Sequence, residues 1–131
     1  MEPVPDDKQK ETINTCIFWA GAWISLADGE FEQSEYENLK SQVGEDVFNK
    51  GIKELESAPD QIVKAQEEYY ASVKPLKTLS APDRCSLIQK LIVVARADQH
   101  IDDEELNVLN KICDNLNVEQ SFVQQILMFL D

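Results

Sequence analysis

ADGEFEQSE at residues 27–35 decides the fold, because a closely similar stretch, ADQHIDDEE, returns at residues 97–105. Each copy follows an apolar helical stretch, opens with Ala-Asp and carries a Glu seven residues after that Asp. The same offset of 70 residues pairs Ile24 with Val94 and Leu39 with Leu109. A repeat of this kind indicates a chain built from two similar halves.

Apolar residues recur at helical spacing along the rest of the chain. Residues 8–28 carry one apolar stripe, and Trp19, Trp23 and Leu26 form a second stripe beside it. A helix with so much apolar surface is usually buried or covered by a partner. Further helices are predicted at 33–43 and 46–56, from 102 and after 117. The two copies of Ser-Ala-Pro-Asp at 57–60 and 80–83 each open another helix, with the Ser as its cap and the Pro in its first turn.

These patterns predict an all-α fold of about seven helices and no strands. The first three helices match the last three, so the expected architecture is two pseudo-symmetric three-helix units joined by a connecting helix. One domain spanning residues 1–131 is expected, with residues 1–7 as a loose N-terminal tail.

The charge balance restricts the class of partner. The 131 residues carry a formal net charge of −13, which disfavours nucleic acid and anionic membrane surfaces and favours cations or basic protein surfaces. The apolar stretch 16–27 is shorter than the ~20 residues of a membrane span, and no signal peptide is recognised. Three widely spaced cysteines indicate free thiols in a reducing compartment. A soluble, cytoplasmic protein is expected.

Catalysis is not expected from this composition. The single His has no evident nucleophile as a partner, and the chain contains neither a glycine-rich phosphate loop nor a nucleophile elbow. No organic cofactor is predicted either.

The duplicated Ala-Asp-Gly turn between two helices, within a small acidic helical chain, resembles the tellurite-resistance TerB-like family. That family also includes the N-terminal domain of membrane-anchored DnaJ-type co-chaperones. The resemblance covers residue 14 to the C-terminus and implies a pseudo-symmetric helical fold, divalent-metal binding and complexes at the membrane. Its acidic positions map onto Asp28, Glu35, Asp98 and Glu105. Gln99 departs from the pattern, where Gly would complete the second turn. No DnaJ module is recognised in this chain.

The acidic turns have two interpretations. In the first, they bind a divalent cation, since no Lys or Arg lies within 28–37 or 98–105 to neutralise their carboxylates. Oxygen ligands suit Ca²⁺, Mg²⁺ or Mn²⁺ better than Zn²⁺. The predicted metal ligands are Asp28, Glu35, Asp98 and Glu105, with Glu32 and Asp102 as additional ones. The spacing does not fit an EF-hand, because Leu39 and Leu109 occupy the position of its bidentate Glu.

In the second interpretation the turns are structural. Glu35 and Glu105 would be capping-box residues that accept hydrogen bonds from their own helix starts, without any metal. Trp19 and Trp23 likewise have two interpretations, as core residues or as a face that binds a protein partner. The sequence thus predicts either a non-catalytic cation-binding module acting in metal or oxidant stress, with a protein partner, or a pure protein-interaction domain. It leaves the oligomeric state open.

Overall fold

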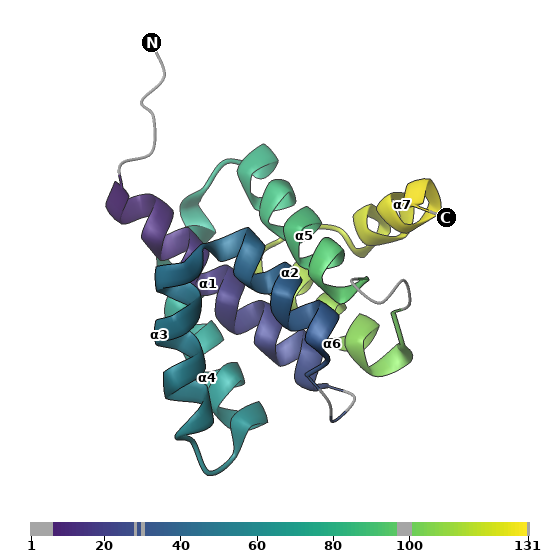
Figure 1. The fold of residues 1–131 in the computed structure, drawn as a ribbon. Helices are drawn as coiled ribbons and strands as arrows, with labels where there is room; N and C mark the ends of the chain where they lie inside the picture. Colours follow the sequence, from purple (N-terminus) through teal and green to yellow (C-terminus); the bar gives the residue numbers. More distant parts are fainter. Residues whose placement is uncertain (1–6, 28, 30, 97–100, 131) are drawn as a thin grey trace.

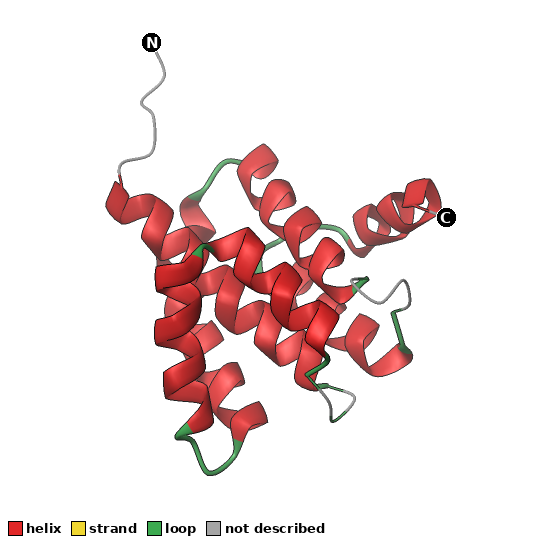
Figure 2. Cartoon of the chain, viewed as in Figure 1, coloured by secondary structure: helices red, strands yellow, loops and turns green. Residues whose placement is uncertain are grey.

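The computed structural model describes residues 7–27, 29, 31–96 and 101–130, and within these ranges the chain forms helices and no strand (Figure 2). The all-α prediction is therefore confirmed. The elements are α1 (Asp7–Leu26), α2 (Gln33–Val43), α3 (Glu45–Glu56), α4 (Gln61–Val73), the 3₁₀ helix η1 (Lys74–Thr78), α5 (Ala81–Ala95), α6 (Asp103–Asn115) and α7 (Gln120–Leu130).

The two repeats occupy equivalent places in the bundle (Figure 1). Helix α1 packs against α2 and α3, and its counterpart α5 packs against α6 and α7. The halves join through α1 against α5, α1 against α6 and α2 against α5. The acidic turn of each repeat thus lies where one half meets the other.

The connecting helix α4 breaks this symmetry. It packs along α1 more extensively than any other helix pair, and the Trp23 ring lies 5.7 Å from Tyr69 and 5.8 Å from Tyr70 between centroids. The residue 70 positions after Trp23 is Val93 on α5, which is 38% exposed. Helix α4 therefore covers Trp23 but not the equivalent position of the second repeat, which explains why α1 carries a second apolar stripe.

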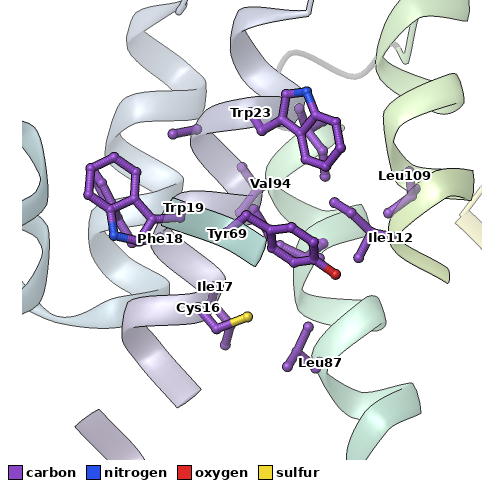
Figure 3. Close-up of a cluster of buried hydrophobic side chains, with 14 of the residues drawn as sticks. Cys16, Ile17, Phe18, Trp19, Trp23, Tyr69, Leu87, Val94, Leu109 and Ile112 are labelled. Carbon is purple, nitrogen blue, oxygen red and sulfur yellow. The ribbon is translucent and has the colours of Figure 1, made fainter. Parts of the chain in front are cut away.

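Tyr69 lies in the middle of the buried cluster, on the side of α4 that faces α1 (Figure 3). Its side chain is fully buried, and its hydroxyl donates a hydrogen bond to Asn115 Oδ1 over 3.0 Å. Burial raises the pKa of this phenol, so it stays a neutral donor. This bond connects α4 to the end of α6, and hence the connecting helix to the second half.

Tyr69→Phe is expected to lower the free energy of unfolding by about 1 kcal/mol, the usual net worth of a hydrogen bond, because it leaves Asn115 Oδ1 without this donor. Urea denaturation measures the change. Tyr70→Phe is the matched control, since Tyr70 is 39% exposed and should lose little. Equal losses in the two variants would contradict the assignment.

The two Ser-Ala-Pro-Asp copies behave differently. At 80–83 the prediction is confirmed, because Ser80 Oγ accepts from the Asp83 N–H at 3.3 Å and begins α5. At 57–60 it is wrong about the capping residue. Ser57 ends α3, and Asp60 caps α4 by accepting from the Val63 N–H at 3.1 Å. Helix α3 continues to Glu56, so the chain needs residues 57–59 to reverse direction before a new helix can start.

The three cysteines are free thiols, as the sequence predicts, and they differ in burial. Cys16 and Cys113 are buried, and burial raises the pKa of each thiol to about 12. Cys85 is half-buried.

Candidate functional site

Glu35 and Glu105 hold equivalent positions in the first turns of α2 and α6. Glu35 Oε1 accepts from the Glu32 N–H at 3.2 Å, and Glu105 Oε1 accepts from the Asp102 N–H at 3.4 Å. Asp102 Oδ1 accepts in return from the Glu105 N–H at 2.9 Å. Both repeats therefore form the predicted capping box.

Capping does not explain why both glutamates are buried. Their exposed fractions are 1% for Glu35 and 2% for Glu105, whereas a capping glutamate normally lies at the surface. The two carboxyl groups meet each other, although α2 and α6 themselves pack little. The two acidic turns are thus brought together in space, which the sequence left open.

This meeting perturbs the protonation of the pair. Burial is the largest cause that raises the pKa of Glu105, followed by its hydrogen bond with Glu35 and the charge of Glu35. The Asp102 N–H acts in the opposite direction but does not compensate. Two carboxylates have no hydrogen between them to donate, so one carboxyl must carry a proton for the hydrogen bond to form.

Glu105 also has an oxygen that the capping box does not use. Its Oε2 atom is buried, and the carboxyl group forms a hydrogen bond with Glu35. This oxygen can therefore take part in sharing a proton with Glu35 or can coordinate a cation.

The other predicted ligands divide into two sets. Glu32 and Asp102 are the half-buried N-cap residues of the same two capping boxes. Each precedes its glutamate by three residues. Asp28 and Asp98 lie outside the described residues. Among the described residues no group of three or more candidate ligands comes together, so a cation bound by Glu35 and Glu105 must complete its coordination with water or with other parts of the turns.

Trp19 and Trp23 are 3% and 4% exposed, which agrees with the interpretation that they belong to the core. Trp23 lies against Tyr69 and Tyr70 of α4, and Trp19 packs edge-on against Phe18 with centroids 4.9 Å apart. Trp19 also borders a surface groove. A partner could therefore reach Trp19 from that groove, while Trp23 lies beneath α4.

The groove itself was not anticipated from the sequence. It has a volume of about 650 Å³ and lies between α1 and α3, with one residue of α4 at its rim. Its charged residues are spread over three helices, so no local motif marks them. The available signal was a run of acidic residues on α3, beginning directly after Gly44.

No helix in the described part of the chain combines the length and the apolar character needed to cross a membrane.

Comparison with known proteins adds one match. The family model described as tellurite resistance protein TerB matches residues 17–127, a range that includes both acidic turns and the Glu35–Glu105 pair. No curated protein and no solved structure matches the chain significantly. Because the match covers well over half of the sequence and the all-helical duplicated fold agrees with it, the chain belongs to the TerB family.

Proposed function

We propose that this TerB-family module binds a divalent cation between its two acidic turns, without catalysing a reaction. The observation that carries the proposal is the burial of Glu35 and Glu105 against each other at the junction of the two halves. Buried carboxylates are normally paired with a cationic group or a metal. Here a shared proton would take the place of the cation, and a bound ion would displace it.

The two glutamates fit a hard cation. Their oxygens are the ligands that Ca²⁺, Mg²⁺ and Mn²⁺ prefer, whereas Zn²⁺ favours His and Cys. In each glutamate a backbone N–H bonds to Oε1, which fixes the direction of the carboxyl group that would meet the ion. Glu32, Asp102, Asp28 and Asp98 are the proposed additional ligands.

The wider role that we propose follows from the family. A module of this kind would act in the response to metal or oxidant stress, in the cytoplasm, together with a protein partner. Coupling between ion and partner is plausible in physical terms because the pair lies at the junction of the two halves, so an ion there would fix their relative position.

The direct test is the thermal midpoint of EDTA-treated protein, alone and with millimolar Ca²⁺, Mg²⁺, Mn²⁺ or Zn²⁺. An ion at 100 times its dissociation constant stabilises by about 2.7 kcal/mol, or several degrees for a domain of this size. We expect this rise for one of the oxygen-preferring ions in the wild type and its loss in Glu35→Gln/Glu105→Gln.

Glu104→Gln provides the control for this test. It removes one carboxylate from the first turn of α6, but its side chain is exposed, so the ion-dependent rise should remain. An absence of any ion-specific rise in the wild type, or an equal rise in both variants, would overturn the cation site.

A second candidate function is a pure protein-interaction domain. The two completed capping boxes favour it, because helix capping gives these glutamates a structural role of their own. Under this alternative the ion experiment gives no shift, and removing Glu35 or Glu105 alters stability equally with and without metal.

A further inference from the structure

The groove between α1 and α3 lies apart from the acidic turns. Glu35 is in the first turn of α2, whereas Gly44, which lines the groove, follows the last residue of that helix. An 11-residue helix spans about 16 Å, so the two sites are separate. A role for the groove therefore goes beyond the cation site and does not depend on it.

Carboxylates dominate the charged lining of the groove. Glu11 comes from α1, and Glu45, Asp46 and Glu54 come from α3, and all four are exposed. The cationic groups beside them are Lys10 and Lys50. Among the described residues the salt bridge found is Lys64–Glu68, so these four carboxylates and two ammonium groups form no ion pair with one another. They remain hydrated and open to an incoming charged group.

The floor of the groove adds apolar surface. Phe18 and Trp19 lie beneath it, and Val47 of α3 is half-buried along one side. A volume of about 650 Å³ accommodates one or two side chains of a partner rather than a whole helix. The lining thus combines an aromatic floor with an acidic rim.

One ammonium group of the protein itself, that of Lys64, already lies beside a carboxylate of the rim and the Trp19 ring. Lys64 Nζ lies 2.9 Å from Glu68 Oε1 and 5.9 Å from the centroid of the Trp19 ring. The hydrogen bond that Lys64 donates to Glu68 is the largest cause that raises the pKa of Lys64, and the charge of Glu54 adds to it. An ammonium group is therefore stable beside this indole and these carboxylates.

We propose that this groove docks a basic segment of a partner protein, in which Lys or Arg residues flank an apolar side chain. The apolar side chain would enter between α1 and α3 toward Trp19. The flanking cations would pair with Glu45 and Asp46 at one end and with Glu54 at the other. The net charge of −13 would accelerate the approach of such a segment.

The test uses a short synthetic peptide of alternating lysine and leucine, labelled with fluorescein, and its binding is followed by fluorescence anisotropy. Glu45→Lys/Glu54→Lys should weaken binding tenfold or more. The matched control is Glu104→Lys/Glu119→Lys, which changes the net charge by the same amount but lies outside the groove. Like the test variant, it replaces one Glu in the first turn of a helix and a second exposed Glu. Lys50→Glu should instead strengthen binding, because it adds a carboxylate to the rim.

The two indoles supply an internal readout. The peptide should shift the NMR resonance of the Trp19 indole N–H, which borders the groove, and leave that of Trp23, under α4, unchanged. Equal weakening in the groove and control variants, equal shifts of both indoles, or no binding by the wild type at low salt would each overturn the proposal. The cation experiment is unaffected by any of these results.

Discussion

Glu105→Gln is expected to make the protein more stable at neutral and alkaline pH, and to change how its stability depends on pH. The amide can still accept from the Asp102 N–H and can donate to Glu35, as the protonated carboxyl does. It replaces a buried carboxyl group that either stays protonated or carries a charge whose burial destabilises the folded protein. We expect a gain of about 1–3 kcal/mol near pH 8.

The sign follows from the raised pKa of Glu105. Between the ordinary value of 4.5 and the raised value, the folded protein holds a proton at this site that the unfolded chain has released. Stability from this group is therefore fully present below 4.5, and falls by about 1.4 kcal/mol per pH unit across that window. The variant lacks this slope.

Urea denaturation of wild type, Glu105→Gln and Glu104→Gln across pH 5 to 9 measures the effect. The exposed Glu104 should give a profile parallel to that of the wild type. A variant less stable than wild type at pH 8, or one with an unchanged pH slope, would show that the charged form of Glu105 stabilises the fold. Together with loss of the ion response, the expected gain would show that the glutamate is retained for binding at the cost of stability.

Gly51→Ala is expected to destabilise the protein by about 1–3 kcal/mol, although Ala in place of Gly within a helix ordinarily stabilises by about 1 kcal/mol. Gly51 lies inside α3, and a Cβ added there would come 2.3 Å from Cε1 of Phe18. That ring is 1% exposed and is held edge-on by Trp19 and Phe48, so it has little room to move.

Gly21→Ala is the matched comparison, measured by the same denaturation. A Cβ at Gly21 would come 2.8 Å from Cδ1 of Leu39, the far end of a flexible side chain, so its cost should be smaller. Phe18→Leu should recover part of the loss in Gly51→Ala, since the clash is with the ring. A Gly51→Ala variant more stable than the wild type would refute the close packing of α3 on Phe18.

Local patterns were sufficient to predict the helices and most of their ends. The Asp102–Glu105 capping box and the Ser80 cap depend on residues three positions apart, so the sequence displays them directly. The cap at 57–60 was misassigned because the end of α3 competes for Ser57, and that competition depends on where the chain must turn.

The candidate site was only half predictable. The sequence identified Glu35 and Glu105 and their capping geometry, but their burial against each other arises from how the two repeats pack. No spacing along the chain encodes a contact between residues 70 positions apart. The groove is a product of tertiary packing in the same way, since its carboxylates belong to α1, α3 and α4.

The unequal cover of the two repeats implies unequal resistance to local unfolding. Helix α1 lies between α4 and the second half, so its amide hydrogens can exchange with solvent only when most of the core opens. Helix α7 packs against α5 and α6, and it leaves Met128 and Phe129 78% and 89% exposed. It lies at the edge of the bundle (Figure 1). The two halves of this duplicated sequence therefore differ in local stability. The first half resists local unfolding, whereas the second half opens first at α7.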